Sequence, residues 1–386
     1  KEDVLNVARP LPAVQQPDPL PGGHRPLPPS PPTIADTTPG WGLTTEVLVA
    51  LARPISGPYG LTLRSGPRRD AIPVGLVERG APLLVTGAAQ GEYTPLRVPS
   101  DLVRPLDEQA ANPDPAILGR ARLGLHTSTD PTISEAEHQE FAAARPGLIK
   151  VLSFHSAADV ARLAAAHPDA AWIVRAFLEF GGRSITPDQF LQDTVADVKR
   201  CLDQLRGKQV VVELHNQPNV AAEGLGTVWS DGATFAAWWL ELLAKYRHVL
   251  PGVRFIYPGL SPGSSVTGVK QDHVRFLETS RTAVLAADGL GLHLYWSAVY
   301  PLRQALQVLD DVIGRFRNHP LWITEAAHNS EAAPAEKARQ YLHFWQELQK
   351  RPLVQGVAYF VASSSHPAVA NQVWLGRGIA AMVGRR

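Results

Sequence analysis

Eight short apolar segments, separated by helix-like segments, constrain the fold of this chain more than any other feature. The apolar segments are residues 121–128, 148–154, 171–178, 209–216, 253–259, 289–296, 320–326 and 354–362. Several are rich in β-branched residues, as strands buried on both faces are. The segments between them carry apolar residues three and four positions apart, which is typical of amphipathic helices. Eight such units in about 260 residues predict an α/β fold, the (β/α)8 or TIM barrel.

A doubly wound open sheet is the structural alternative. That fold usually carries a glycine-rich phosphate turn after its first strand. Here the first strand ends in the sequence LGLHTSTD, which has no such turn. The barrel is therefore the favoured fold.

The part of the chain before residue 121 divides into three pieces by composition. Residues 1–40 are rich in proline, including PLPPSPP at 26–32, which favours an extended polyproline II arm. Residues 41–106 form short apolar runs separated by turn residues, which predicts a small all-β barrel of about five strands. Residues 107–120 form a polar linker. We interpret the arm either as a solvated spacer or as a segment for self-association with neighbouring copies.

Composition restricts the partners of this chain. The net charge is +1 and 19% of residues are charged, so there is no general attraction to nucleic acid or to anionic membranes. No run approaches the roughly 20 apolar residues of a membrane span. Cys201 is the only cysteine, which excludes an intrachain disulfide framework. The chain begins at Lys1 and its only methionine is Met382, from which we expect a processed, exported protein.

The segment QVVVELHNQPN, residues 209–219, turns from a buried strand into polar side chains within two residues. Barrel enzymes place their chemistry at this carboxyl end of a strand. The residues Asn216, Gln217 and Pro218 resemble the strand-four motif of the clan A retaining glycoside hydrolases, an Asn-Glu-Pro run that carries the acid/base glutamate. The segment 322–326, WITEA, resembles the strand-seven motif of the same clan. The resemblance implies that Glu325 is the nucleophile and that Gln217 stands at the acid/base position.

A second resemblance covers about 60 residues of the N-terminal part. The segment 61–85 resembles the bacterial SH3-like family, in which a Leu-x-Leu-Arg-Ser-Gly-Pro run precedes a strand and an Arg-Gly-Ala turn. The usual final Gly-Trp-Val strand is not evident. Modules of this family bind cell-wall or partner surfaces, and the alternative is a spacer that packs on the barrel.

The polar and aromatic residues near the predicted strand ends suit a sugar site, because hydroxyl groups need donors and acceptors and pyranose faces pack on aromatic rings. We expect substrate contacts from His126, Arg175, His215, Asn216, Tyr257, His293, Tyr295 and Trp296, and from Trp229 in the loop after the fourth strand. The resemblance implies that Asn216 binds the sugar 2-hydroxyl. It implies no cofactor and no metal.

Retaining hydrolysis needs two carboxyl groups, one to attack the anomeric carbon and one to protonate the leaving oxygen and later activate water. Arg175 and Tyr295 would favour the ionised form of Glu325. The Gln217 amide has no proton to give, and loss of general acid/base help costs on the order of 10²- to 10⁴-fold in rate. This form is expected to be inactive or very slow.

Three interpretations remain open from the sequence. The chain is a retaining glycosidase of an extracellular polysaccharide that carries an isosteric Glu-to-Gln change, or a natural pseudoglycosidase that binds glycan or serves as a structural subunit. The third is a metal-dependent barrel hydrolase with His126, His215 and His293 as ligands. The SH3-like resemblance favours a location outside the cell or on its surface. The sugar, the linkage and endo or exo action do not follow from the sequence.

Overall fold

The computed structural model describes residues 37–43, 59–64, 67, 73–78, 84–90, 93–99, 103–105, 120–317 and 319–386. Residues 1–36 of the predicted arm and residues 107–119 of the predicted linker lie outside the described residues. Self-association through the arm therefore stays a prediction.

The N-terminal strands form one antiparallel sheet. They are β1 (Thr37–Leu43), β2 (Tyr59–Arg64), β3 (Pro73–Glu78), β4 (Leu84–Val85), β5 (Tyr93–Pro99) and β6 (Val103–Pro105), in the order β4-β5-β1-β2-β3-β6. The whole of β1 pairs with β5, from Thr37 opposite Pro99 to Leu43 opposite Tyr93. Residues 37–40, which composition assigned to the arm, are thus part of the sheet. An SH3-like identity for this sheet stays a prediction.

The C-terminal part contains the predicted barrel of eight parallel strands. They are β7 (Arg122–His126), β8 (Leu148–Leu152), β9 (Ala171–Ala176), β10 (Val210–Leu214), β11 (Phe255–Ile256), β12 (Leu290–Trp296), β13 (Leu321–His328) and β14 (Val354–Tyr359). Their order is β11-β10-β9-β8-β7-β14-β13-β12. The two ends of this order meet at Tyr257, whose N–H donates to Gly289 O at 2.9 Å and whose carbonyl accepts from Gly291 N at 2.7 Å. The barrel prediction is confirmed.

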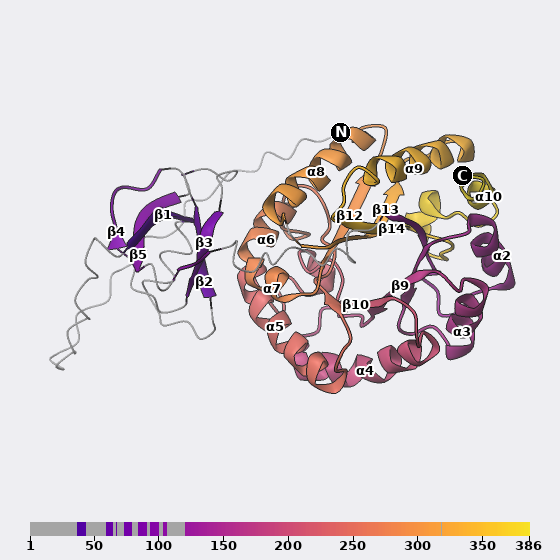
Figure 1. The fold of residues 1–386 in the computed structure, drawn as a ribbon, viewed down its shortest axis with the longest axis horizontal. Coiled ribbons are helices and arrows are strands. Elements are labelled where there is room, and N and C mark those ends of the chain that lie inside the picture. Colours follow the sequence, from indigo (N-terminus) through magenta and orange to yellow (C-terminus); the bar gives the residue numbers. More distant parts are fainter. Residues whose placement is uncertain are drawn as a thin grey trace, which may run out of the picture.

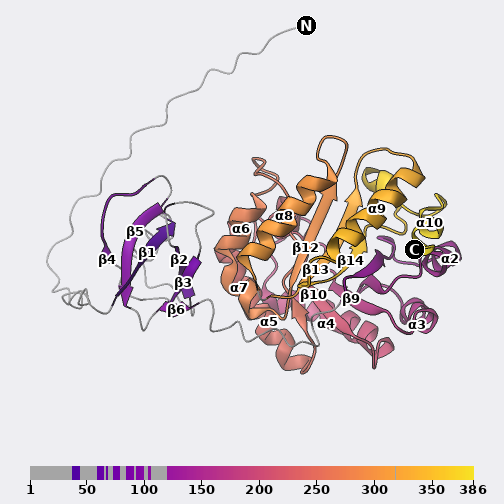
Figure 2. The ribbon, with the colours of Figure 1, turned by 45° about the horizontal axis from the view of Figure 1, so that its top comes forward.

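Helices follow the strands in turn and surround them, as Figures 1 and 2 show. The helices are α2 (Glu135–Ala144), α3 (Ala157–Ala166), α4 (Pro187–Gln204), α5 (Gly232–Val249), α6 (His273–Thr279), α7 (Arg281–Ala286), α8 (Leu302–Arg315), α9 (Pro334–Leu348) and α10 (Ile379–Gly384), with 3₁₀ helices η3 (Ala221–Glu223) and η4 (Pro367–Gln372). Capping boxes begin α2 at Ser134, α4 at Thr186 and α5 at Asp231. These caps satisfy the free N–H groups of the first turn.

The strands bury residues on both faces, because one face of each strand lines the barrel and the other contacts the helices. A small interior cluster includes Ile173, Val211, Ile256 and Trp322. A much larger cluster lies between strands and helices and includes Trp172, Val212 and Phe255. Neighbours in sequence therefore point to opposite sides, and this alternation decides which strand residues can reach a site inside the barrel.

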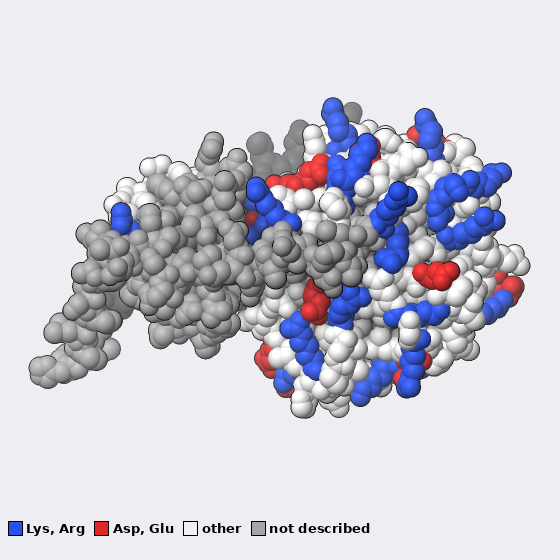
Figure 3. Space-filling view, in the orientation of Figure 1, with Lys and Arg blue, Asp and Glu red and all other residues white. Residues whose placement is uncertain are grey.

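Charged side chains of both signs lie on the described surface of the barrel (Figure 3). Figure 3 shows Lys and Arg distributed around the barrel, with Asp and Glu between them. Among the described helices, none combines the length and apolar character needed to span a bilayer.

Candidate active site

An irregularity in β13 directs Glu325 into the barrel. Leu292 of β12 lies opposite Ile323, but the next residue, His293, lies opposite Glu325, so Thr324 is an extra residue in β13. A bulge of this kind changes the direction of the side chains that follow it. Both Thr324 and Glu325 consequently contact groups on other strands inside the barrel.

Two donors hold the Glu325 carboxylate. Tyr295 Oη of β12 donates to Glu325 Oε2 at 2.5 Å, and Lys150 Nζ of β8 donates to Glu325 Oε1 at 3.2 Å. The Glu325 residue is 4% exposed. Each carboxylate oxygen thus has its own donor, and the side chain is fixed in orientation before any substrate arrives.

Lys150 and Glu213 form an ion pair beneath Glu325 that the sequence prediction missed. Lys150 Nζ lies 2.8 Å from Glu213 Oε2, and both side chains are fully buried. Glu213 Oε1 accepts from the Thr324 hydroxyl at 2.7 Å and from Gly259 N–H at 3.1 Å. The sequence did carry a signal for this pair. Lys150 lies within the apolar segment LIKVLSF, and a lysine in a buried strand needs an acidic partner.

Gln217 contacts His293, which in turn contacts Glu325. The Gln217 side-chain nitrogen lies 2.8 Å from His293 Nδ1, and the same Nδ1 lies 3.5 Å from Glu325 Oε2. With the Gln217 amide in this orientation its nitrogen donates, His293 accepts at Nδ1, and the ring proton lies on Nε2, which has no hydrogen-bond partner among the described residues. Burial lowers the pKa of His293 to about 4, which keeps the ring neutral at pH 7. Gln217 and Glu325 therefore lie on two sides of one imidazole nitrogen.

The electrostatic environment keeps Glu325 ionised. Burial alone would raise the pKa of its carboxyl, but His293, Lys150 and His126 lower it more, and the pKa lies well below its usual range. At neutral pH the positive charge comes from Lys150, because burial also lowers the pKa of His126 to about 3. Such a carboxylate stays ionised, and is therefore available as a nucleophile, at neutral pH.

Asn216 joins this site to a second carboxyl group. Its side-chain nitrogen donates to Glu223 Oε1 at 2.8 Å, and Asn216 is 7% exposed. Glu223 ends the short helix η3 in the loop that follows β10. The pKa of Glu223 is raised, chiefly by burial and also by the charges of Glu325 and Glu179. Arg175 and the hydrogen bond from Asn216 act in the opposite direction. Sequence reasoning did not single out Glu223, because a loop glutamate without a motif carries no signal of its own.

Arg175 and His126 lie near the same carboxylates. Arg175 is buried, with 9% of its surface exposed, yet it forms no ion pair among the described residues. Its guanidinium lies 5.1 Å from the centre of the Phe177 ring. His126 is fully buried, with Nδ1 2.8 Å from Thr127 O and its ring edge-on to Phe360 at 5.2 Å. His126 lies opposite Lys150 in the sheet and Arg175 lies opposite Glu213, which places both beside the residues around Glu325.

Four of the predicted substrate contacts lie in the outer layer instead. His215 has φ 86°, and this left-handed conformation turns its ring away from the barrel interior onto Phe180, where the two rings stack at 4.8 Å. Trp229 is 3% exposed, and its indole N–H donates to Pro218 O at 2.7 Å. Other aromatic rings pack against both of these rings, and the expectation that the two contact a sugar stays a prediction.

Tyr257 and Trp296 also make their polar contacts in the outer layer. The Tyr257 hydroxyl lies 2.7 Å from Ser280 Oγ, and the Trp296 indole donates to Gln340 Oε1 of α9 at 2.7 Å. Tyr257 is fully buried and Trp296 is 1% exposed. In β12 the side chain of Trp296 points opposite to that of Tyr295, as strand alternation requires.

The histidines of the metal interpretation do not form a common site. His126 and His293 lie near Glu325, whereas His215 belongs to the aromatic layer under α5. In the described part of the chain, no three His, Cys, Asp or Glu side chains are arranged to hold a metal ion. The position of His215 therefore separates it from the other two histidines.

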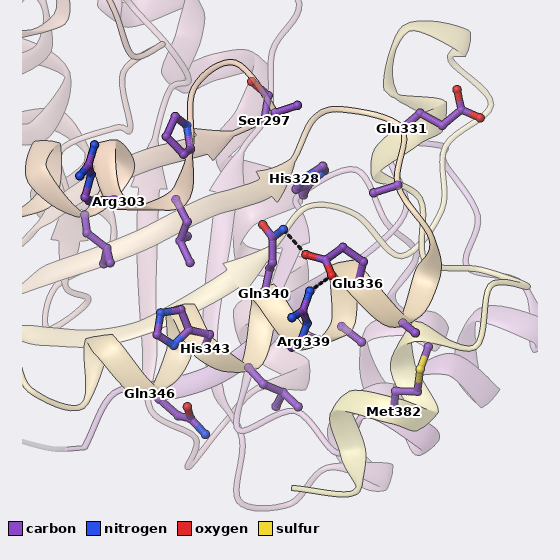
Figure 4. A pocket seen from close by; sticks show the side chains of 18 residues that line it. Ser297, Arg303, His328, Glu331, Glu336, Arg339, Gln340, His343, Gln346 and Met382 are labelled. Carbon is purple, nitrogen blue, oxygen red and sulfur yellow. Dashed lines mark hydrogen bonds and ion pairs between the residues drawn. The ribbon is translucent and has the colours of Figure 1, made fainter.

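A groove on the outside of the barrel is separate from this site. It has a volume of about 1220 Å³ and lies along α8 and α9. Figure 4 shows Arg303, Glu336 and Arg339 among its lining side chains. None of the predicted site residues lines it.

One family model and several solved structures are similar to this chain. No curated protein sequence matches it. A GH128 (subgroup II) endo-β-1,3-glucanase from Sorangium cellulosum is 18% identical, with a TM-score of 0.47 over 68% of this chain and 98% of its own. An endo-1,4-β-mannanase from Rhizomucor miehei is 11% identical, with a TM-score of 0.42 over 69% and 95% of the two chains. A broad-specificity GH5-4 endoglucanase from Clostridium longisporum is 12% identical, with a TM-score of 0.43 over 70% and 97%.

The family match covers the strands that carry most of the site. Residues 179–379 match the glycosyl hydrolase catalytic core. This range is more than half of the chain, and it includes Gln217, Glu223, His293, Tyr295 and Glu325. With a complete (β/α)8 barrel and a buried carboxylate held inside it, the chain belongs to the glycosyl hydrolase catalytic core family.

Proposed function

We propose that this protein is a retaining glycoside hydrolase of an extracellular polysaccharide, with Glu325 as the nucleophile. The observation that carries the proposal is the state of the Glu325 carboxylate. It is buried, ionised and held by Tyr295 and Lys150 at 2.5 and 3.2 Å. A nucleophile must be fixed in place and kept unprotonated, and these two donors do both for Glu325.

The position of Gln217 supports the same reaction class. Gln217 and Glu325 both approach His293 Nδ1, at 2.8 and 3.5 Å. A glutamate at position 217 would therefore face Glu325 at a short distance, as the carboxyl pair of a retaining enzyme does at roughly 5 to 5.5 Å. The Gln217 amide can accept or donate a hydrogen bond at the glycosidic oxygen, but it transfers no proton.

The residues around Glu325 are suited to a neutral sugar ring. Asn216 keeps a second N–H for a hydroxyl group, because only one of its two donors is needed for Glu223. Arg175 has donors without an ion-pair partner among the described residues. The ring of Phe360 packs against His126 and is partly exposed. Donors beside an aromatic ring recognise a carbohydrate.

In the first step Glu325 attacks the anomeric carbon, and the bond to the leaving oxygen breaks. Tyr295 and Lys150 hold the carboxylate in line during this attack, and Tyr295 keeps its proton because burial, with the Glu325 charge, raises its pKa well above the usual value. In the second step water attacks the anomeric carbon and Glu325 leaves as a carboxylate.

Trapping of the glycosyl-enzyme tests this function. The protein is incubated with 2-deoxy-2-fluoro-glycosides that carry a dinitrophenyl leaving group, which needs no protonation. We expect a mass increase on the peptide that contains Glu325, and none in Glu325→Gln. The proposal is overturned if no sugar of a broad panel labels Glu325 and neither the protein nor Gln217→Glu releases reducing ends from any polysaccharide.

A glycan-binding pseudoglycosidase is the second candidate, and one contact favours it. The Gln217 amide donates to a neutral His293 nitrogen, which is an arrangement that suits an amide as it stands. In that case the protein binds oligosaccharide in calorimetry but never labels Glu325. A working enzyme that carries an isosteric change instead labels Glu325, and Gln217→Glu raises its turnover.

A further inference from the structure

The loop after β10 brings a second glutamate to the site, and it is not the one at the position of the family motif. Glu223 lies six residues after Gln217 and accepts from Asn216, the residue that precedes Gln217. We propose that Glu223 donates the proton to the leaving glycosidic oxygen in this chain and later removes the proton from the attacking water. This proposal rests on the glycosidase function proposed above.

The loop that carries Glu223 is fixed at several points, so the position of this carboxyl is a property of the fold. Val220 N–H donates to Gln217 O at 2.9 Å, and Ala221 N–H donates to Val269 O at 2.8 Å. Asn219 donates to Ser261 O and Gln271 O and accepts from Ser261 N–H, all within 2.9 Å. Trp229 is hydrogen-bonded to Pro218 O. The loop therefore returns Glu223 to the end of β10 instead of extending away from the barrel.

The Glu223 side chain has a free hydrogen-bonding position. Its Oε1 accepts from Asn216, and no contact of Oε2 is recorded among the described residues. The residue is partly exposed, so a ligand can reach it. Oε2 is therefore open to a glycosidic oxygen, as the proton-bearing oxygen of a general acid must be.

The surroundings of Glu223 and Glu325 shift the pKa values of the two carboxyl groups in opposite directions. Burial raises the pKa of Glu223, although Arg175 and the Asn216 hydrogen bond oppose this, and the charges of Glu325 and Glu179 add to the rise. The pKa of Glu325 is lowered. Two carboxyl groups whose environments separate their pKa values in this way are the pattern of an acid and a nucleophile.

The proposed step balances without any further reactant. As Glu325 bonds to the anomeric carbon, the glycosidic C–O bond breaks and the Glu223 proton moves to the leaving oxygen, which departs as an alcohol. The Glu223 carboxylate then takes a proton from water, whose oxygen displaces Glu325. One glycosidic bond and one water give two hydroxyl products, and both carboxyl groups return to their starting states.

The test compares Glu223→Gln with Glu179→Gln. Glutamine at 223 can still accept from Asn216, so the loop contact is kept while the proton is lost. Glu179 is exposed and its charge also acts on Glu223, which makes it a matched control. We expect Glu223→Gln to lower kcat/KM on unactivated oligosaccharides by about 10²- to 10⁴-fold, with labelling by the dinitrophenyl fluoroglycoside unchanged. We expect Glu179→Gln to retain activity.

Two further readouts separate a proton donor from a structural residue. The alkaline limb of the kcat/KM profile should disappear in Glu223→Gln, because that limb reports deprotonation of the acid. Gln217→Glu in the Glu223→Gln background should restore activity, since it places a carboxyl at the motif position. If Glu325 is labelled and Glu223→Gln behaves like Glu179→Gln, Glu223 is not the donor and the glycosidase function stands. If nothing labels Glu325 and no variant turns over, the glycosidase function itself falls.

Discussion

Lys150 Nζ donates to Glu325 Oε1 at 3.2 Å from a different strand of the barrel, and both residues are buried. The same ammonium group lies 2.8 Å from Glu213 Oε2. One cation therefore balances two carboxylates in a region of low dielectric constant, where an uncompensated charge is costly. The candidate nucleophile depends on this lysine for its charge state and for its position.

Lys150→Met should destabilise the fold by about 3 to 5 kcal/mol, because it leaves two buried carboxylates without their cation. Urea denaturation at pH 7 measures the effect. Glu213→Gln in the same background should recover part of the loss, because one of the two unpaired charges is then removed. Equal stability losses in the single and double variants would contradict the shared ion pair.

Tyr295→Phe should weaken catalysis while leaving the fold intact. It removes the 2.5 Å hydrogen bond to Glu325 Oε2, and a hydrogen bond to a charged group contributes about 1.5 to 3 kcal/mol. We expect a loss of roughly 10- to 100-fold in the rate of Glu325 labelling. Rates that match those of the parent protein would show that Tyr295 does not orient the nucleophile.

The barrel could be predicted from sequence because its strands are continuous apolar runs and its helices have regular apolar spacing. Strand limits were less accurate. The segment 253–259 was predicted as a strand, but β11 contains only Phe255–Ile256, and Tyr257 joins the neighbouring strand by a single bridge. The predicted arm ended at residue 40, whereas β1 begins at Thr37. Composition could not place this boundary, because residues 37–40 belong to the sheet through their pairing with β5.

The site could be predicted only where a motif or a charge marked it. Glu325 and Gln217 came from a resemblance. The side chains of Tyr257 and Trp296 could have been assigned to the outer layer from strand alternation alone. His215 could not, because its positive φ breaks that alternation and no sequence rule predicts it. Glu223 depends on the path of a loop held by side-chain contacts far apart in sequence, such as Asn219 with Gln271.

Stability should fall as the pH drops from 6.5 toward 4. Burial lowers the pKa of His126 and His215 to about 3 and that of His293 to about 4. In the unfolded chain each titrates near 6.5, so below that pH the unfolded state binds more protons than the native state. Each histidine contributes up to about 1.4 kcal/mol per pH unit. Denaturant titrations from pH 7 to pH 4.5 measure the slope.

His215→Asn provides the matched variant for this pH dependence. Asparagine tolerates the left-handed backbone of position 215 and does not titrate. The variant should start less stable, because aromatic packing is lost, but its slope with pH should be smaller by about 1.4 kcal/mol per pH unit. An unchanged slope would show that His215 is not the neutral buried group that we describe.

Gly259→Ala should impair the site because of one steric contact. A Cβ at position 259 would lie 2.2 Å from His293 Cδ2 and 2.5 Å from its Nε2. The His293 ring would have to move, and its contact with Gln217 would be lost. The control is Gly314→Ala in α8, where a Cβ meets nothing within 4 Å and the helix should gain about 0.5 to 1 kcal/mol. Equal Glu325 labelling rates in the two variants would contradict a role for the His293 position.

Gln217→Glu should reverse the proton position on His293. The Gln217 amide donates to His293 Nδ1, which fixes the proton on Nε2, whereas an ionised glutamate accepts and requires a proton on Nδ1. The two ring nitrogens of the neutral imidazole have different ¹⁵N shifts, so NMR on protein labelled at histidine should show the Nε2–H tautomer for Gln217 and the Nδ1–H tautomer, or the cation, for the glutamate. Because the new carboxylate also stabilises the imidazolium, the pKa of His293 should rise from about 4.

His126, which has no contact with Gln217 among the described hydrogen bonds, serves as the internal reference. Identical His293 signals in both proteins would mean that Gln217 does not contact the ring in solution, and the shared position of Gln217 and Glu325 beside one imidazole nitrogen would lose its basis.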